Sequence, residues 1–446
     1  MTAANTTLFL QRDTKIFVTE KANAKAYEIP ALEGLSFSQS VNNATVTLNE
    51  ASPDGNTQRR GSAAFAESLA PAEWSFQTYL RPTLEDNGGN YVNGDRDDGN
   101  KHGAIEEILW AALAGDLSAT DGNSTTFPAD GSNKDITGWT FGTTNATLDF
   151  ASSNKLQLAK LDMFFALSGM GTASDDNLNV IYHLDEAVVN EVSIDFDIDG
   201  IATCTWSGFA KKIAEVTGGA RPDSTTAGYF QNISANNVIT ATPNGDTVTA
   251  QNTSTSNFIQ NRLSEVVLAT NSGTDPNTNY LDAYTVTLTG GSITISNNIS
   301  YVTPSMMQTV NQPLGHVVGS RTVSGNLTCY ADSTTGRSID LYEDLQEASV
   351  FDATNMFDLR IYLGGKASAF LPNGPGALFF LPAAHIDIPT HNIEDVISFD
   401  IGFTGLASNG VFAVNASTGV VTQTTAVTAT NSLTATNELL VVMTGA

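Results

Sequence analysis

Hydrophobic and polar residues alternate along most of the chain, and this alternation predicts β-strands. The runs at residues 45–48, 74–79 and 194–199 largely switch between apolar and polar side chains from one position to the next, and clusters of glycine and asparagine separate such runs. A period of two places one face of a strand against a core and the other face in water. The pattern therefore predicts a mainly β, α+β fold built from many short, half-buried strands.

Two segments have the period of a helix instead. In residues 104–113, the apolar side chains of Ile105, Ile108, Leu109 and Ala112 fall on one stripe, which predicts an amphipathic helix. Residues 338–348 predict a second helix. Helices are few, so they are expected to flank the sheets rather than to form the core.

The two helices have similar surroundings, which indicates an internal repeat. Residues 187–210 match residues 384–407 without a gap, and residues 36–43 resemble residues 292–298. In each copy a strand ending in Tyr79 or Tyr330 precedes the helix, and a further strand at residues 161–167 or 357–363 follows it. We therefore expect a duplication.

The repeat gives the expected division of the chain. It comprises a first domain at residues 1–215, a linker at residues 216–255, a second domain at residues 256–408 and a C-terminal extension at residues 409–446. The linker is rich in Gly, Thr, Ser and Asn. The extension has no helical pattern, and two alternatives remain open for it: a β tail packed on the second domain, or a flexible segment.

Composition narrows the classes of function. The 446-residue chain carries 47 acidic against 20 Lys and Arg residues, a formal net charge of −27. A protein that grips nucleic acid by its phosphates needs clustered Lys and Arg, so this class is excluded. No apolar run reaches the length of a membrane-spanning helix, and the N-terminus lacks the pattern of a signal peptide, so no membrane partner is expected.

Motifs for chemistry are largely missing from the sequence. The five histidines form no metal-binding pair, and neither a nucleophile elbow nor a phosphate-binding loop occurs. The loop at residues 93–100 resembles a calcium loop, but its register puts Gly94 where a carboxylate is required. Cys204 and Cys329 have strand-like neighbours and are expected to be buried, unpaired side chains. We therefore expect no catalytic residue, no metal ion and no cofactor, and a protein that is not an enzyme.

One acidic strand stands out among the predicted strands. Side chains at every second position share a face, so Asp195, Asp197 and Asp199 are expected on one face, with apolar residues on the other. Three like charges on one face are tolerated mainly where water is abundant. Two interpretations remain: an ordinary wet sheet face, or a face that lines a large solvent-filled space.

Several segments resemble the tail tube proteins of long-tailed phages. The likeness lies in residues 8–18, in residues 35–40 leading to residues 46–51, and above all in residues 60–79, which include Glu73, Trp74, Ser75 and Phe76. Residues 299–304 and 321–330 are the counterparts in the second half, and residues 202–208 resemble the closing strand of the first domain. The chain looks like the siphophage type that carries two tube domains in one chain.

The resemblance implies an architecture and a role. Each domain would be a β-sandwich or half-barrel with one flanking helix, and the domains of several chains would close into a ring-shaped β-barrel. Three chains would give six domains, a trimeric ring with pseudo-sixfold symmetry, and rings would stack into a tube. Asp195, Asp197 and Asp199 would line a negatively charged lumen. The tube would house the tape measure protein and conduct double-stranded DNA without binding it specifically.

The resemblance also implies contacts and a location. A loop at residues 51–72 would be an arm that reaches the next ring, with Arg59 and Arg60 as cations that pair with its acidic groups. A solvated loop is the alternative. The matching loop at residues 304–321, with Met306 and Met307, would be a second contact surface. Other tail proteins would bind the tube ends, and the protein would occur in the virion tail after assembly in the host cytoplasm.

Such relatives can also carry an immunoglobulin-like domain at the C-terminus. Residues 409–446 are too few for a sandwich of about 100 residues. We therefore expect the decoration function of such a domain to be absent.

Two rival classes share parts of the pattern. A secreted or surface β-rich adhesin or S-layer-like binding protein would have a similar Thr-, Asn- and Ser-rich composition, but the expected lack of a signal peptide counts against it. A carbohydrate-acting enzyme would use Asp and Glu, yet the sequence places no acidic pair in a cleft.

Overall fold

A computed structural model describes most of the predicted strands. It covers residues 14–20, 27–32, 34–46, 63–84, 102–115, 139–141, 145–151, 158–168, 179–216, 258–270, 283–302, 313–351, 357–365, 375–393, 396–407, 411–414, 421–425 and 437–445. We call residues 14–216 the first half and residues 258–407 the second half. Most of the predicted linker, at residues 217–255, lies outside the described residues.

The elements of the first half are mostly strands. They are β1 (Lys15–Glu20), β2 (Tyr27–Ile29), β3 (Ser36–Ser38), β4 (Val41–Val46), β5 (Ala63–Leu69), β6 (Ala72–Tyr79), β7 (Pro82–Leu84), β8 (His102–Ala104), α1 (Glu107–Ala114), β9 (Trp139–Phe141), β10 (Ala146–Ala151), β11 (Leu161–Ser168), β12 (Asn179–Asp197), β13 (Thr203–Ala210) and β14 (Lys212–Val216).

The second half and the C-terminal segment have the same character. They contain the 3₁₀ turn η5 (Asn261–Leu263), β15 (Glu265–Thr270), β16 (Ala283–Val286), β17 (Leu288–Ser296), β18 (Ser300–Val302), β19 (Gly315–Val317), β20 (Thr322–Tyr330), α2 (Ser338–Phe351), β21 (Phe357–Leu363), β22 (Gly376–Ile386), β23 (Thr390–Ile393), β24 (Ile397–Gly405), β25 (Val411–Val414), β26 (Val421–Thr425) and β27 (Asn437–Thr444). The prediction of a mainly β fold with few helices is confirmed.

The two halves repeat one order of antiparallel strand pairings. In the first half the order is β2–β1–β11–β12–β13–β6–β3. In the second half it is β16–β15–β21–β22–β24–β20–β17, and β23 continues β22 along β24. Each half also has a hairpin after its β3 or β17 strand, β4–β5 and β18–β19.

A β-bulge at one place in each half shows which residues of the two halves correspond. Leu161 opposes Ala187 and Phe357 opposes Ala384, and the register shifts directly afterwards in both pairs of strands. Such a bulge bends the strand and re-aims its side chains. The sequence match of β12 with β22 therefore agrees with the register.

In strands β13 and β24 the structural correspondence differs from the sequence match. The sequence match paired Gly208 with Gly405, whereas the strand registers pair Gly208 with Phe403. Gly208 of β13 opposes Trp74 of β6, whereas Phe403 of β24 opposes Gly325 of β20. Each half thus puts one aromatic ring over one glycine, with the two residue types exchanged between the strands. In both places a Cβ atom on the glycine would lie within 2.5 Å of the ring.

The first helix differs from the prediction. Every residue of α1 is buried, including Glu107, so it is not an amphipathic surface helix. Trp110 packs edge-on against Trp206 of β13, with ring centroids 5.1 Å apart, and lies 6.1 Å from Phe379 of β22. The helix is wedged between the two halves, and the local sequence could not reveal this because the second partner comes from a distant segment.

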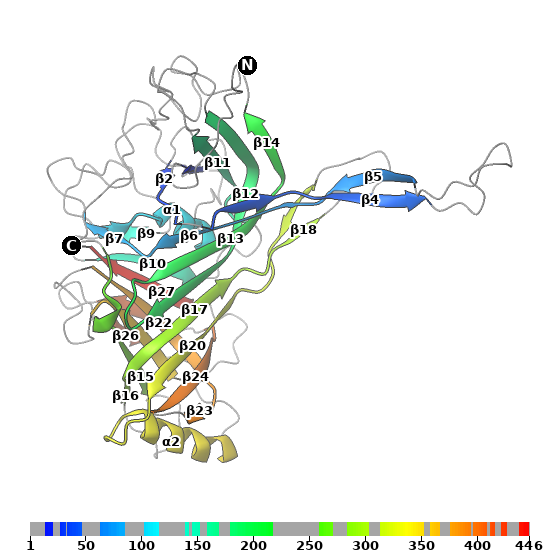
Figure 1. Cartoon of the computed structure of the whole chain (residues 1–446). Coiled ribbons are helices and arrows are strands. Elements are labelled where there is room, and N and C mark those ends of the chain that lie inside the picture. Colours follow the sequence, from blue (N-terminus) through cyan, green and yellow to red (C-terminus); the bar gives the residue numbers. More distant parts are fainter. Residues whose placement is uncertain are drawn as a thin grey trace, which may run out of the picture.

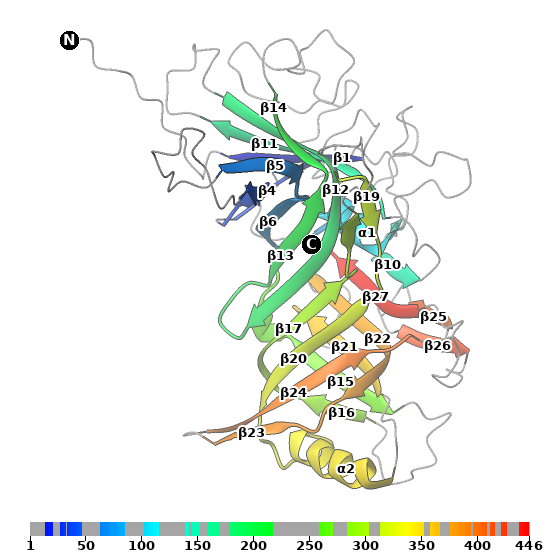
Figure 2. The same cartoon turned by 90° about the vertical axis from the view of Figure 1, so that its right-hand side faces the viewer.

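The two halves join through strand pairing. The C-terminal part of β12 pairs with β17, so the sheets of the two halves run into one another. Strand β27 lies between β10 of the first half and β22 of the second. The C-terminal segment thus packs on the second half, as one alternative predicted, and on the first half as well. Figures 1 and 2 show this continuous arrangement, with α2 at the far end.

Arg321 adds side-chain contacts across the same junction. Its guanidinium donates to the backbone oxygen of Ala114 at the end of α1 (2.9 Å) and to that of Phe150 (3.3 Å). Asn297 donates to the oxygen of Leu113 (2.9 Å). The last two carbonyl groups of α1 therefore receive hydrogen bonds from the second half.

Candidate functional site

One face of the joined sheet carries a mainly polar surface. We call the strands β3–β6–β13–β12–β17–β20–β24–β23, in this order, the polar sheet. Its strands run diagonally across the molecule in Figure 2. The alternation in each strand is regular, as in β6 and β13, where buried and more exposed side chains take turns. The registers place the polar positions of neighbouring strands opposite one another.

Most side chains on this surface are small, polar or acidic, although the alternation also places Tyr79, Phe209 and Tyr330 on this face. They include Ser36, Ser75, Gln77, Thr205, Ser193, Thr294, Ser324, Thr328, Ser398 and Thr390, together with the carboxylates of Glu73, Glu191, Asp195, Asp197 and Asp400. The described strands of the polar sheet contain no lysine or arginine at all. The described strands therefore give this surface negative charge with no compensating lysine or arginine.

Hydrogen bonds tie these side chains together across the strands. The hydroxyls of Ser36 and Ser75 lie 2.8 Å apart, and Gln77 Nε2 donates to Thr205 Oγ1 (3.0 Å). Asp400 accepts from Thr328 Oγ1 (2.8 Å) and from Asn392 Nδ2 (2.5 Å). Cross-strand pairs of this kind stabilise the sheet and use up donors that could otherwise bind a passing ligand.

The structure places two of the three predicted aspartates on this surface. Asp195 and Asp197 are exposed and alternate with the buried Ile194 and Phe196. Partial burial raises the pKa of Asp195, and the carboxylate of Asp197 accepts from the backbone nitrogen of Ile198 (2.6 Å). Their neighbour on the same face is Glu191, which sequence reasoning missed although it continues the same alternation.

The prediction that Asp199 continues this face is wrong. Strand β12 ends at Asp197, and residues 198–200 form a turn. There the Asp199 carboxylate pairs with Arg262 (2.6 Å), and both side chains are largely exposed. The alternating letters of the sequence extend past the point where the backbone leaves the strand.

The predicted inter-ring contact residues lie outside the described part of the chain. Arg59 and Arg60 fall between β4 and β5, and Met306 and Met307 fall between β18 and β19. The described strands β4 and β5 form a hairpin that extends away from the rest of the molecule (Figure 1). The predicted arm thus begins as a projecting hairpin.

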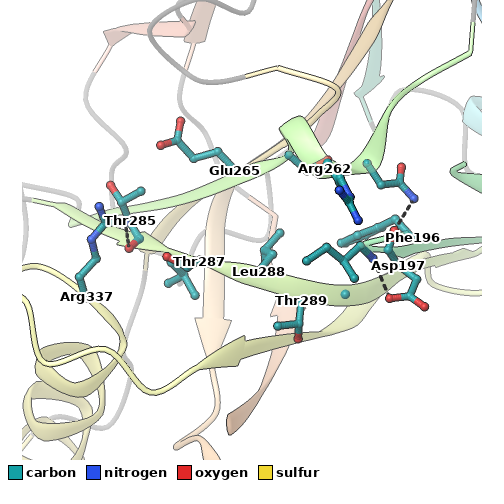
Figure 3. Close-up of a pocket in the computed structure, with 14 residues that line it drawn as sticks. Phe196, Asp197, Arg262, Glu265, Thr285, Thr287, Leu288, Thr289 and Arg337 are labelled. Carbon is teal, nitrogen blue, oxygen red and sulfur yellow. Dashed lines mark hydrogen bonds between the residues drawn. The ribbon is translucent and has the colours of Figure 1, made fainter. Parts of the chain in front are cut away.

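A pocket of about 490 Å³ lies beside the acidic end of β12. Phe196, Arg262, Leu288 and Arg337 line it, as Figure 3 shows. Both guanidinium groups are engaged, Arg262 with Asp199 and Arg337 with the backbone oxygen of Thr285 (3.0 Å). We therefore assign no ligand to it.

A second cluster offers metal-ligating atoms away from the polar surface. Asp162, His183 and Asp185 place one ligand atom each within 4.8 Å of one another. His183 Nε2 already contacts Asp162 Oδ1 (3.1 Å) and its ring stacks on Phe164.

The second half has an ion pair at the corresponding place. Asp358 is held there by Arg360, with Nε 2.8 Å from Oδ1, and Arg360 lies over the ring of Phe380. Each half thus places a basic side chain against a buried aspartate, so we interpret the cluster of the first half as a structural contact.

Glu106, the residue that precedes α1, has a buried carboxyl group. Burial raises the pKa of Glu106 to about 8, against which the charge of Arg81 acts in the opposite direction. Burial also lowers the pKa of Arg81, whose guanidinium lies over the ring of Phe258. Cys204 and Cys329 are buried and unpaired, as predicted.

Comparison with known proteins agrees with the resemblance found in the sequence. No family model matches the chain. The chain is 27% identical over 407 residues to Tail tube protein pb6 of Escherichia phage T5, a match that covers 90% of this chain and 73% of the relative. This chain is similar to a siphophage tail tube protein. The predicted resemblance is confirmed, and it extends over nearly the whole chain. Among the described helices, none is long and apolar enough to cross a bilayer.

Proposed function

We propose that the chain is a structural protein of a phage tail and that its polar sheet lines the lumen of the tail tube. The similarity to a tail tube protein supports the structural role. The observation that carries the lumen assignment is the acidic surface of the polar sheet, which runs through both halves and has no lysine or arginine in its described strands.

The charge of this surface suits a conduit for DNA. Lysine and arginine side chains bind phosphates by releasing counterions, and such binding would slow a moving duplex. The carboxylates of Glu191, Asp195 and Asp197 repel the phosphates instead. Hydrogen-bonded Ser, Thr and Asn side chains leave a hydrated surface between them. The lumen would hold the tape measure protein first and conduct double-stranded DNA afterwards, without specific binding.

The repeated order of strand pairings supports a ring of three chains. Each chain contributes two halves of like topology, joined edge to edge by β12 and β17. Three such chains supply six tube domains and give pseudo-sixfold symmetry. Closure into a barrel removes exposed sheet edges, which are otherwise sites of aggregation. Rings would then stack, and other tail proteins would bind the two ends of the tube in the virion.

The projecting hairpin supports a contact between stacked rings. Strands β4 and β5 lead to the segment with Arg59 and Arg60, and strands β18 and β19 lead to the segment with Met306 and Met307. The arginines would pair with acidic groups of the next ring, and the methionines would add apolar contact.

The lumen assignment is tested by reversing the charge of the polar surface. In tubes of Asp195→Lys/Asp197→Lys chains, we expect assembly to persist and DNA release to slow at least tenfold, because the duplex then meets rings of cations. Release is followed by the fluorescence of a DNA-binding dye after receptor triggering. The matched control, Glu215→Lys/Glu343→Lys, reverses the same number of exposed charges away from the polar sheet. Equal release from both variants would refute the lumen assignment.

A further inference from the structure

The junction inside the chain shows how one tube domain holds the next. Strands β12 and β17 pair from Glu191 opposite Ser296 to Asp197 opposite Gly290. Just beyond this ladder, Asn190 accepts twice from the second half: its backbone oxygen from Asn297 N and its side-chain oxygen from Ile299 N, both at 2.8 Å. The junction thus consists of a strand pair and a side-chain clamp.

The hairpin that follows β17 also rests on the first half. Tyr301 at the start of this hairpin donates its hydroxyl to the backbone oxygen of Glu186 (2.8 Å), and its ring lies 6.2 Å from that of Phe209. Ile299 packs with Val188 and Leu158 in a small apolar cluster. The second half therefore holds the first with both its edge strand and its hairpin.

The same two edges recur, without a described partner, at the ends of the polar sheet. Strand β3 corresponds to β17. Ser36 opposes the residue after Trp74 on β6, and Ser292 opposes the residue after Gly325 on β20, where Trp74 and Gly325 belong to the two aromatic–glycine pairs. Strand β23 corresponds to the end of β12, because Asn392 lies as far beyond Ala384 as Asp195 lies beyond Ala187. Among the described strands, β3 pairs only with β6, and β23 pairs only with β24.

Apolar side chains are exposed around both free edges. Ile393 of β23 is 79% exposed, and Val396 beside it is 59% exposed. On the other edge, Val41 and Phe65 of the hairpin are 46% and 56% exposed. A sheet edge flanked by exposed large apolar side chains is a surface that a partner covers.

We propose that β3 of one chain pairs antiparallel with β23 of a second copy of this chain, in the register that β17 uses on β12. Ser36 then opposes Asn392 of the second copy, and Ser38 opposes Thr390. Phe37 meets His391 on the core side, and Leu35 covers Ile393. This proposal rests on the proposed function, since it defines how the tube domains of neighbouring chains meet.

The polar and apolar faces agree with this register. Ser36, Ser38, Thr390 and Asn392 all lie on the polar side of their strands, with Ser36 beside Ser75 and Asn392 beside Asp400. The pairing therefore continues the polar surface from chain to chain without a break. A shift by one residue would turn Phe37 and Ile393 towards opposite faces, which is why register is well specified when one face is apolar.

The clamp has a counterpart as well. Asp387 occupies the place of Asn190, beyond the β23 ladder, and its side chain is largely exposed. The nitrogen that corresponds to Ile299 N is that of Asn43 in the projecting hairpin. The carboxylate of Asp387 of the second copy therefore accepts from the backbone nitrogen of Asn43 of the first chain, a charge-assisted bond where the internal junction has a neutral one.

The internal junction also tells which pairs can be cross-linked. Ile198 N donates to Thr289 O, and Asn297 N donates to Asn190 O, so these are the hydrogen-bonded pairs of the ladder. Asp195 and Ser292 then form a non-hydrogen-bonded pair, with Cα atoms about 4.5 Å apart. The corresponding pair between chains, Ser36 and Asn392, has the spacing that a disulfide needs.

Cysteine cross-linking in assembled tubes tests the proposal. In tubes of Ser36→Cys/Asn392→Cys chains, oxidation should convert more than half of the protein into covalent multimers on non-reducing gels, and the series should end at three chains. Each single variant gives at most a background of dimer. Ser38→Cys/Asn392→Cys, two residues off register, is the matched control and should cross-link at least tenfold less. The native cysteines are buried and should not interfere.

The outcomes separate this proposal from the proposed function. Tubes that form in electron micrographs but cross-link off register, or not at all, overturn the junction and leave the tube assignment intact. Failure of the native chain to form or enter tubes overturns the tube assignment itself.

A second variant tests the same junction without cysteines. Ile393→Asp should abolish tube formation while the monomer keeps its thermal unfolding midpoint, because this side chain has few contacts within the chain. Leu263→Asp changes another exposed apolar residue, away from both edges, and should still form tubes. Normal tubes from Ile393→Asp chains would overturn the junction.

Discussion

The buried carboxyl group of Glu106 makes the stability of the chain depend on pH in a defined direction. Burial raises its pKa from 4.5 to about 8 in the folded chain. A raised pKa means that the folded chain holds this proton more tightly than the unfolded chain does. The stabilisation is therefore complete below about pH 4.5 and is lost as the pH rises to about 8.

The size of the effect follows from the same two values. Each pKa unit of difference between the folded and unfolded chain corresponds to about 1.4 kcal/mol. The free energy of unfolding should therefore fall by up to about 5 kcal/mol from this group between pH 4.5 and pH 8. Glu106→Gln removes the titration, because glutamine resembles the protonated acid. The variant should match the native chain near pH 5 and be more stable than it at pH 8.

Urea unfolding followed by tryptophan fluorescence measures this difference. Trp110 and Trp139 are suitable reporters, since Trp110 lies on α1 and Trp139 Nε1 donates to the oxygen of Glu107 (3.0 Å). The difference between the urea midpoints of variant and native chain should grow from pH 5 to pH 8. Glu343→Gln, which neutralises an exposed carboxylate of α2, is the control and should give no such trend. A difference that stays constant with pH would show that Glu106 does not titrate with a raised pKa in the folded chain.

Two further predictions concern packing and the contact between rings. Gly325→Val should destabilise the chain by about 3 kcal/mol in thermal unfolding, because its Cβ would lie 2.2 Å from Ser292 O and 2.4 Å from the Phe403 ring. The control Gly315→Val has open space around its Cβ and should be nearly neutral. Equal unfolding midpoints of the two variants would contradict the close packing at Gly325. Arg59→Glu/Arg60→Glu should shorten tubes and lower their yield in electron micrographs, whereas Lys212→Glu on β14 should not; unchanged tube length and yield would refute the proposed ion pairs of the arm.

Local patterns predicted the elements whose environment is itself local. The helix at residues 338–348 is α2, the strand at residues 357–363 is β21, and the strands that end at Tyr79 and Tyr330 are β6 and β20. The alternation of Asp195 and Asp197 with Ile194 and Phe196 also gave their two faces correctly. In these segments the period of the side chains and the register of the neighbours agree.

Features that depend on distant partners could not be predicted in this way. The helix α1 is buried all round because β22 closes its second side, and nothing in residues 104–113 encodes that contact. Strand β27 fills a place between β10 and β22 that lies far away in sequence. Glu73 and Asp400 join the acidic surface through strand registers, which the sequence of each strand leaves open.

In the proposed tube, the polar sheet lines the lumen of a ring of three chains. Electron cryomicroscopy of assembled tubes, reconstructed without imposed sixfold symmetry, shows both the number of chains in a ring and the face that meets the lumen. We expect threefold rings in which Glu191, Asp195 and Asp197 face the lumen and β3 of one chain lies beside β23 of the next. Rings of six chains, or a polar sheet that faces outwards, would contradict it.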